Sequence, residues 1–335
     1  METRKVQLSG GTTYTVSLPK SWATEQRITS GSVLYLHPDD DGTLLVEAGE
    51  RRETDGRTVE LDVSNYAPET LAHAVASAYL GGVDELVLVD RGGHDDETID
   101  AAMDLTANLS GFEVIETGER RLVFQNIIDP SSVSIRKTVL RLKLVALAMH
   151  RDAVRAVTEA DVGLARQVVS RDAEADKLFS LVTRQFQRAL DDLQTVEKLD
   201  LSRPELFEYY HTARQFERIG DHAAKMAYLV TDRSEDLAEV DVDEFARLAR
   251  ESRRIVERAA DVVLTDADAT TAFDVIDDAT ALEEATTELD EDLYGHEDAV
   301  AAYVVGLLLE SVRRTAGYGR NVAEMGLRRT IRRGE

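Results

Sequence analysis

The sequence predicts a multidomain α+β protein that is mainly α-helical. Three patterns along its 335 residues lead to this prediction. Short β-branched or alternating stretches occupy residues 1–48, strand and helix patterns alternate through 58–130, and apolar residues recur at helical spacing from Ser131 onward. A chain of this length fits two or three domains. We therefore expect a strand-rich front domain, a small α/β sandwich and a large helical part.

The composition fits a folded protein of a reducing compartment. The chain has 64 Asp and Glu against 39 Lys and Arg, a net charge of −25, and 43% hydrophobic residues, which is enough to form cores. It has no cysteine, which excludes disulfides and thiolate metal sites and favours a cytoplasmic location. No apolar run is long enough to cross a bilayer, so we expect no membrane span. The acidity argues against nucleic-acid binding over the whole surface and suits a halophilic cytoplasm, where salt screens repulsion.

Residues 1–48 form the one basic part of the front half. Four strand patterns are separated by turn residues and lie at Thr3–Leu8, Tyr14–Leu18, Val33–His37 and Leu44–Glu47. In the first 30 residues two acids, Glu2 and Glu25, stand against the four cations Arg4, Lys5, Lys20 and Arg27. A domain this small is marginally stable alone, so interlacing with a second chain would stabilise it.

The run from Lys5 to Ala23, KVQLSGGTTYTVSLPKSWA, resembles the swapped-hairpin DNA-binding domains of the AbrB/MazE type. In that family two chains interlace into one small barrel whose basic loops meet DNA. The resemblance implies a homodimer in which the DNA contacts are made by Arg4, Lys5, Lys20 and Arg27. The alternative is a β-domain that only dimerises.

The middle of the chain predicts a small α/β sandwich. Residues 49–57 are charged and rich in turn residues, and we interpret them as a linker. The segment 58–130 then follows the order β-α-β-α-β-β. Its elements are expected at Thr58–Val63, Pro68–Leu80, Glu85–Asp90, Glu97–Leu109, Phe112–Ile115 and Leu122–Ile128.

From Ser131 onward the pattern is helical. Six helices are expected, at about 133–158, 161–196, 203–231, 241–264, 271–294 and 297–331. They form a three-helix unit that occurs twice, at 131–232 and 238–335. We therefore expect two three-helix bundles.

Two acid pairs stand out within these helices. Glu217 and Asp221 are four residues apart, so both carboxylates leave one side of the helix and repel each other unless a cation binds between them. Gly220 lies between them at a cost of about 1 kcal/mol relative to Ala, and we expect it to let a neighbouring helix come close. Asp172 and Asp176 repeat the spacing, and Asp172 falls in the apolar register of its helix, where an unpaired acid is costly to desolvate.

The run from Glu217 to Ala227, ERIGDHAAKMA, closely resembles the signature of the PhoU family, the helical regulators of phosphate uptake. The segment Asp172–Leu178 is similar to the D-x-x-I-D-x-L pattern of PhoU repeats. The resemblance covers about 200 residues. It implies that a metal ion is bound by Asp172, Asp176, Glu217 and Asp221.

Oxygen ligands with at most one imidazole, from His222, suit hard or borderline cations. Mg, Mn, Fe and Zn, as divalent or ferric ions, all remain open. The alternative is that these acids are neutralised by ion pairs with Arg184, Arg214 and Arg218.

The second repeat departs from the family pattern. An offset of 96 residues puts Arg313 at the position of Glu217 and Gly317 at that of Asp221. Asp274 and Asp278 are the expected counterparts of the acids at 172 and 176. We therefore expect one metal site, and solvated arginines at the end of the last helix: Arg328, Arg329, Arg332 and Arg333.

Together these patterns predict a phosphate-responsive transcriptional regulator, in which a PhoU-type helical sensor is coupled to an AbrB-like DNA-binding domain. The expected partners are DNA, a second copy of the chain, and a phosphate transporter or signalling protein. The alternative is an accessory protein that does not bind DNA and regulates a phosphate or ion transporter. An enzyme is not expected, because the sequence has no nucleophile–base arrangement and no P-loop.

Overall fold

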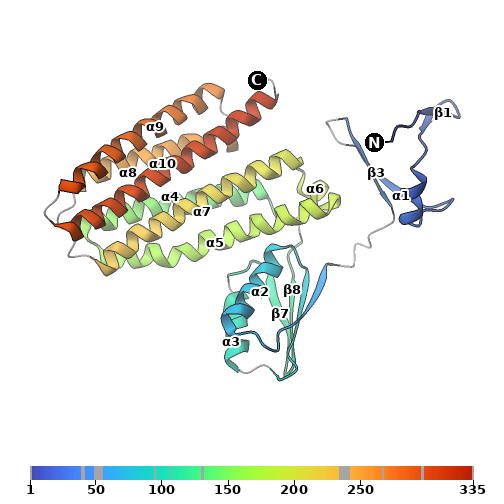
Figure 1. Ribbon diagram of the computed structural model, residues 1–335, viewed down its shortest axis with the longest axis horizontal. Coiled ribbons are helices and arrows are strands. Elements are labelled where there is room, and N and C mark those ends of the chain that lie inside the picture. Colours follow the sequence, from blue (N-terminus) through green and yellow to red (C-terminus); the bar gives the residue numbers. More distant parts are fainter. Residues whose placement is uncertain are drawn as a thin grey trace. The chain divides into compact units, whose positions relative to one another are not determined.

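The computed structural model describes residues 2–38, 42–48, 56–93, 96–106, 108–129, 132–233, 242–265, 268–295 and 298–333. Its contacts divide the chain into two units, Met1–Gly56 and Arg57–Glu335. The predicted linker, 49–57, lies outside the described residues except for Gly56 and Arg57. The predicted start of the second repeat, at 238, also lies outside them. Figure 1 shows the elements of both units.

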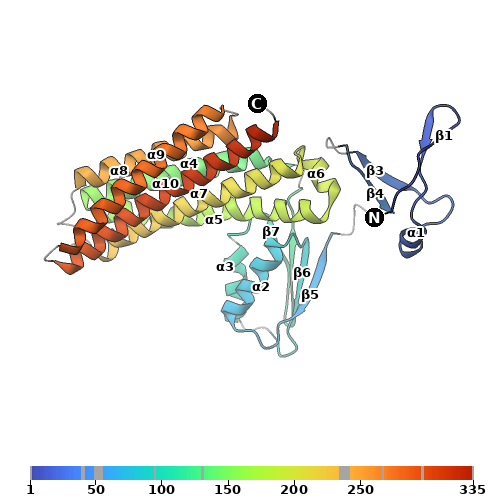
Figure 2. The same cartoon turned by 45° about the horizontal axis from the view of Figure 1, so that its top comes forward.

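The front unit consists of two antiparallel hairpins and a short helix (Figure 2). Strands β1 (Gln7–Ser9) and β2 (Thr13–Thr15) form the first hairpin, and β3 (Leu34–Pro38) and β4 (Leu44–Ala48) form the second. Strands β3 and β4 lie where they were predicted, whereas β1 and β2 are shorter and overlap the predicted Thr3–Leu8 and Tyr14–Leu18 only next to the turn that joins them. Helix α1 (Lys20–Glu25) lies between the second and third predicted strands, where the sequence predicts only turn residues; Pro19 directly precedes the helix.

No described residue of the front unit is buried. Eight large apolar side chains are more than a third exposed: Val6, Leu8, Tyr14, Val16, Val33, Leu36, Leu44 and Leu45. Two isolated hairpins are marginal in water unless an apolar face is covered. Within its described residues, this unit therefore does not form a core of its own.

The α/β part has the predicted element order. It contains β5 (Thr58–Asp62), α2 (Pro68–Leu80), β6 (Glu85–Val89), α3 (Asp96–Thr106), β7 (Phe112–Gly118) and β8 (Arg121–Asn126). The sheet has the order β5-β6-β8-β7, with β5 parallel to β6 and the other neighbours antiparallel. Both helices cover one face of the sheet (Figure 1), where Leu71, Val75 and Tyr79 of α2 pack on Leu86 and Phe124.

The helical part contains the six predicted helices and one break. They are α4 (Ile135–Glu159), α5 (Val162–Asp191), α7 (Arg203–Asp232), α8 (Val242–Leu264), α9 (Ala269–Asp292) and α10 (Ala299–Arg333). The predicted helix 161–196 ends early. Asp192 takes an extended conformation, and its carboxylate accepts a hydrogen bond from Thr195 Oγ1 at 2.9 Å. A separate short helix, α6 (Leu193–Leu199), follows.

Side-chain caps set where several of these helices begin. Asp161 accepts from the Leu164 amide at 2.9 Å at the start of α5, and Asp268 does the same for Thr271 at the start of α9. At the start of α7, Ser202 and Glu205 form a reciprocal capping box.

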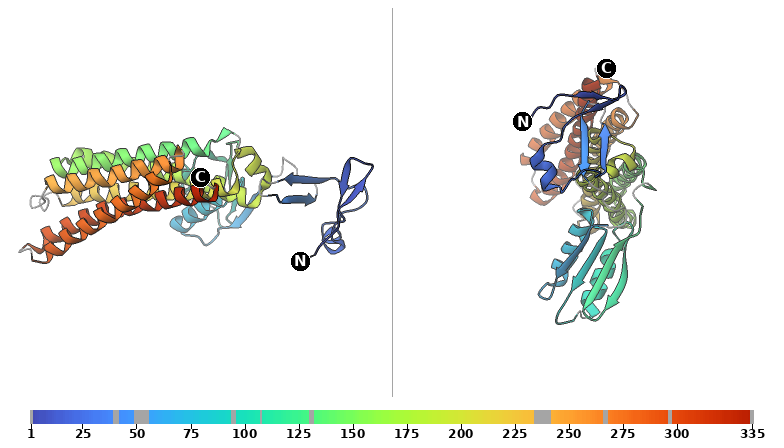
Figure 3. Two further views of the ribbon diagram at one scale, coloured as in Figure 1. Left: turned by 90° about the horizontal axis from the view of Figure 1, so that it is seen from above. Right: turned by 90° about the vertical axis from the view of Figure 1, so that its right-hand side faces the viewer.

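The two predicted bundles share one core. Buried apolar residues of both repeats form a single cluster, and α7 packs on α10 while α4 packs on α8 (Figure 3). Polar contacts join α7 to α10 as well: Arg332 and Arg329 pair with the buried Glu208. The expectation that these arginines are solvated is thus wrong for Arg329, which is buried and donates to the Val263 carbonyl at 2.8 Å.

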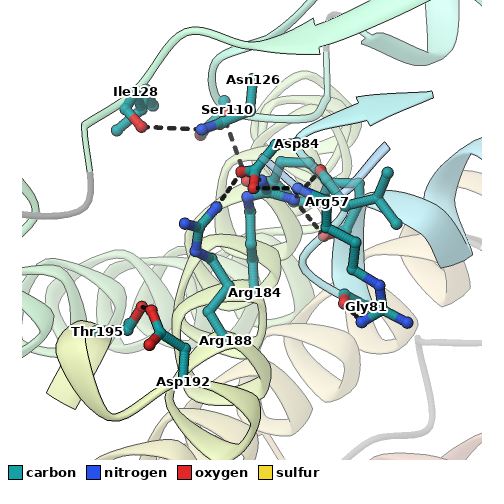
Figure 4. A network of polar contacts seen from close by, with 12 residues as sticks. Arg57, Gly81, Asp84, Ser110, Asn126, Ile128, Arg184, Arg188, Asp192 and Thr195 are labelled. Atoms are coloured by element: carbon teal, nitrogen blue, oxygen red, sulfur yellow. Dashed lines mark hydrogen bonds and ion pairs between the residues drawn. The ribbon is translucent and has the colours of Figure 1, made fainter. Parts of the chain in front are cut away.

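A buried arginine fixes the α/β part to the bundle (Figure 4). Arg184 of α5 is 1% exposed and donates to the carbonyls of Tyr79 and Val83, both at 2.8 Å. It also pairs with Asp84 at 3.1 Å, which Arg188 contacts too. No local sequence pattern indicates this anchor, because Asp84 lies in a loop 100 residues away from Arg184.

Candidate metal centre

Three predicted ligands meet where α5 packs against α7. Asp176 of α5 and Glu217 and Asp221 of α7 each place one carboxylate oxygen within 4.8 Å of the others. The four-residue spacing sets the two α7 acids on one face, and the crossing of the helices brings the α5 acid to them. Asp172, one turn along α5, lies close enough for Asp176 and Asp221 to raise its pKa.

The four carboxyl groups of this cluster disfavour one another's ionisation. Burial, followed by repulsion from Asp221, raises the pKa of Glu217 to about 7. Burial, followed by repulsion from Asp176, raises the pKa of Asp172 to about 6. Loss of hydration raises the pKa of Asp176 and of Asp221 as well. Four carboxylates therefore share a region with too little positive charge to stabilise their ionised forms.

Two buried oxygen atoms of the cluster are suited to binding a cation. Asp172 Oδ1 and Glu217 Oε2 are buried and accept no hydrogen bond from the described residues. Orphaned buried acceptors are costly, and carboxylate oxygens are the ligands that hard divalent cations prefer. The residues fit a metal ion held by Asp176, Glu217 and Asp221, with Asp172 beside them. Such an ion would neutralise the acids and link α5 to α7.

The ion-pair alternative is found only in part. Arg214 pairs with Glu217 Oε1 at 3.3 Å, and its guanidinium lies over the Phe179 ring at 5.2 Å. The predicted ion pair of Arg184 with these acids is wrong, because its guanidinium pairs with Asp84 and anchors the α/β part. Arg218 and Lys225 also lower the pKa of Asp221 through their charges, but burial outweighs all three cations and the pKa of this acid stays raised.

His222 does not point toward the acids. Its Nδ1 lies 3.2 Å from Ser311 Oγ and its Nε2 lies 3.4 Å from the Tyr318 hydroxyl, both on α10. Burial lowers the pKa of His222 to about 4, so the imidazole is neutral and joins the two repeats. His222 therefore does not supply the one imidazole that the sequence allows beside the oxygen ligands.

Gly220 is not required by close packing. A Cβ atom at this position would lie 3.5 Å from Ala175 Cβ and 3.8 Å from Asp172 Oδ1, which are ordinary contacts. The predicted close approach of a neighbouring helix thus leaves room for a methyl group.

The corresponding place in the second repeat holds arginines. A Cβ atom on Gly317 would lie 3.1 Å from Glu283 Oε1, so Glu283 of α9 faces this position. Arg320 pairs with Glu283 at 2.7 Å. The predicted counterparts were wrong in register: Asp274 and Asp278 pair instead with Arg258 of α8. A guanidinium therefore neutralises the acid that faces Gly317 in the second repeat.

The predicted DNA contacts all lie on the surface of the front unit. Lys5, Lys20 and Arg27 are exposed. Within the described part of the chain, their side chains form no ion pair and no hydrogen bond. Arg4 pairs with Glu2 at 2.5 Å. The three other cations are therefore available to an anionic partner.

Comparison with known proteins assigns the helical segment that carries the acids. Residues 139–230 match the family model of the PhoU domain. This segment includes Asp172, Asp176, Glu217 and Asp221, so the acid cluster lies inside the matched segment. The predicted resemblance is confirmed for this segment, whereas the likeness of residues 1–48 to AbrB-type domains stays a prediction.

Two solved structures share the helical fold. The crystal structure of PhoU from Pseudomonas aeruginosa is 23% identical, with a TM-score of 0.53 over 60% of this chain and 96% of that one. The phosphate transport system regulatory protein PhoU from Streptococcus pneumoniae is 17% identical, with a TM-score of 0.50 over 60% of this chain and 94% of that one. No protein with a curated function matches the sequence. Among the described residues, no helix is long and apolar enough to cross a membrane.

Proposed function

We propose that the chain is a phosphate-responsive regulator of phosphate uptake, whose PhoU domain binds a metal ion and whose front unit binds DNA as a homodimer. The observation that carries the proposal is the acid cluster of Asp176, Glu217 and Asp221 inside the PhoU domain. The two PhoU proteins of similar fold, one of them named as a regulator of a phosphate transport system, support the link to phosphate.

The metal ion is tested by removing ligands. In the double variant Glu217→Ala/Asp221→Ala the bound metal should be lost, because two of three clustered carboxylates are gone. The matched control is Asp274→Ala/Asp278→Ala, an acid pair of the same spacing that Arg258 already neutralises. Elemental analysis of protein purified without chelator gives the metal content and its identity among Mg, Mn, Fe and Zn. Equal metal content in Glu217→Ala/Asp221→Ala and in the control variant would refute the proposed metal site.

The dimer is supported by the exposed apolar residues of the front unit. Eight large side chains without a core of their own match a surface that a second copy covers. A variant beginning at Arg57 should be monomeric in light scattering where the full chain is dimeric. A dimer of undiminished affinity in the shortened variant would move the interface to the helical part.

DNA binding is supported by the cations that this acidic protein leaves unpaired at its front. Lys5→Ala/Lys20→Ala should weaken binding to the promoter of a phosphate-transport operon, measured by fluorescence anisotropy at several salt concentrations. The salt dependence should also lessen, by roughly 0.9 in slope per lost phosphate contact. The control is Arg166→Ala/Arg203→Ala, two exposed cations of α5 and α7. Because Arg4 pairs with Glu2, Arg4→Ala should act more weakly than Arg27→Ala.

The second candidate is an accessory protein that regulates a phosphate or ion transporter without binding DNA. It is favoured by the fact that the family match lies wholly in the helical part. A reporter gene under the phosphate-transport promoter separates the two, in cells that carry Lys5→Ala/Lys20→Ala at high and low phosphate. Normal repression in this variant, together with an unaltered chain that binds the promoter no better than scrambled DNA, would favour the accessory protein.

A further inference from the structure

Helix α8 carries a dense cluster of cations in a protein of opposite charge. Five arginines fall within twelve residues of a chain whose net charge is −25: Arg247, Arg250, Arg253, Arg254 and Arg258. The spacing of 247, 250, 254 and 258 puts four of them on one face of the helix. At 1.5 Å per residue this row extends over about 16 Å.

The row lines a hollow between α8 and α9. The hollow has a volume of about 530 Å³, within the range of small-molecule sites. Its lining, which we call the arginine groove, consists of Arg247, Arg250, Glu251, Arg254, Ile255, Arg258 and Asp278. Four guanidinium groups face two carboxylates there, so the lining carries a net charge of +2.

The chain itself neutralises only the two ends of the row. Arg247 pairs with Glu244 at 2.6 Å and with Glu251 at 3.1 Å, and Arg258 pairs with Asp278. The two middle residues, Arg250 and Arg254, are exposed and make no ion pair or hydrogen bond with their side chains within the residues that the structure describes. Like charges one helical turn apart destabilise the helix. An anion bound between them would remove this cost.

The pKa of Arg253, also on α8, is affected by the charges of the neighbouring arginines. Burial lowers the pKa of Arg253, and repulsion from Arg151, Arg250 and Arg254 lowers it further against the opposing effect of Glu257. Arg250 and Arg254 therefore act on Arg253 as well as on each other, while Glu257 opposes them.

We propose that the arginine groove binds a condensed inorganic phosphate, a chain of two or more linked phosphate groups. Guanidinium groups donate paired hydrogen bonds that match phosphate oxygens, and two free ones stand about 5–6 Å apart at their Cβ atoms, one helical turn along α8. Two free guanidinium groups one helical turn apart can each bind one phosphate group of a linked pair, which a single orthophosphate does not offer. The described lining holds no aromatic side chain, so the base of a nucleotide has no stacking partner.

The groove is separate from the acid cluster, because it lies on α8 and α9 whereas the acids lie on α5 and α7. Its occupation does not depend on the metal ion or on the front unit. The inference therefore stands or falls independently of the proposed function.

The test is calorimetric titration of the full chain with sodium tripolyphosphate at fixed ionic strength. Arg250→Gln/Arg254→Gln should bind it at least about tenfold more weakly than the unaltered chain, since two charge-assisted contacts are lost. Arg166→Gln/Arg203→Gln makes the same change of net charge elsewhere and should bind normally. Glu217→Ala/Asp221→Ala should also bind normally, which excludes capture of the anion through a metal ion. Circular dichroism checks that each variant is folded.

Four results would overturn the proposal. One is the absence of binding by the unaltered chain, and another is an equal loss in the Arg166/Arg203 control. Orthophosphate or ATP binding more tightly than tripolyphosphate would assign the groove to a different anion. Sedimentation with phosphatidic acid vesicles that is lost in Arg250→Gln/Arg254→Gln, without tripolyphosphate binding, would assign it to a lipid headgroup.

Discussion

Replacing Glu217 by glutamine should stabilise the metal-free protein at high pH. The side chain is 13% exposed and its Oε2 atom accepts no hydrogen bond from the described residues. Burial raises the pKa of Glu217 from 4.5 to about 7. A raised pKa means that the folded state disfavours the ionised carboxylate relative to the unfolded chain. Each pKa unit corresponds to 1.36 kcal/mol, so ionising Glu217 in the folded state costs about 3 kcal/mol.

The sign of the pH dependence follows from this cost. The folded protein holds a proton at Glu217 between about pH 4.5 and 7 where the unfolded chain has lost it, so stability falls as the pH rises through this window. Glutamine carries no charge at any pH. The free energy of unfolding of Glu217→Gln should therefore equal that of the unaltered chain near pH 4.5 and exceed it by about 3 kcal/mol near pH 8.

The assay is urea unfolding followed by circular dichroism, with EDTA present to remove metal. Glu288→Gln, an exposed position on α9, is the control and should change the free energy by less than about 0.5 kcal/mol. When metal is added instead of EDTA, the unaltered chain should gain stability and Glu217→Gln should not. A glutamine variant that loses stability equally at both pH values would show that the carboxylate serves its ion pair with Arg214, and the reasoning would fail.

Two further substitutions test the packing around the site and the anchor. Gly220→Ala should raise the free energy of unfolding by up to about 1 kcal/mol, since a Cβ atom there makes ordinary contacts; a loss of stability in the same urea assay would mean that the helices cannot accept the methyl group. Arg184→Met should lower it by at least about 2 kcal/mol, because the carbonyls of Tyr79 and Val83 lose their donor, while Arg57→Met, at an exposed ion pair with Asp191, should change it by less than about 1 kcal/mol. Similar losses in these two arginine variants would contradict the assignment of Arg184 as a buried anchor.

Much of the local structure follows from the sequence. Apolar residues at helical spacing predict the six helices of the bundle, and alternating or β-branched stretches between turn residues predict eight strands. Both predictions lie close to the observed elements, because the side-chain period of a helix or a strand depends only on its own residues. Helix α1 and the break at Asp192 were missed. In both cases one residue decides whether a helix begins or ends. A proline can precede a helix or form a turn, and an aspartate can continue a helix or interrupt it, so the residue type alone does not settle the boundary.

Individual helices also reveal part of the site. The spacing of Glu217 and Asp221 alone sets both acids on one face of their helix, and the family resemblance, confirmed for 139–230, marks that face as important. Periodicity does not, however, give the axial position of one helix against another. For this reason the sequence pattern predicts Asp274 and Asp278 as counterparts of the first-repeat acids, although Glu283 faces Gly317.

The sequence by itself determined which residues are helical and which acids share a face, because both depend on neighbours three or four positions apart. The tertiary structure decided what those faces meet. Packing of α7 against α10 turned His222 toward Ser311, and docking of the α/β part buried Arg184 beside Asp84. These contacts join residues about 90 and 100 positions apart, and their energies depend on burial and on the charges brought together, which no local pattern records.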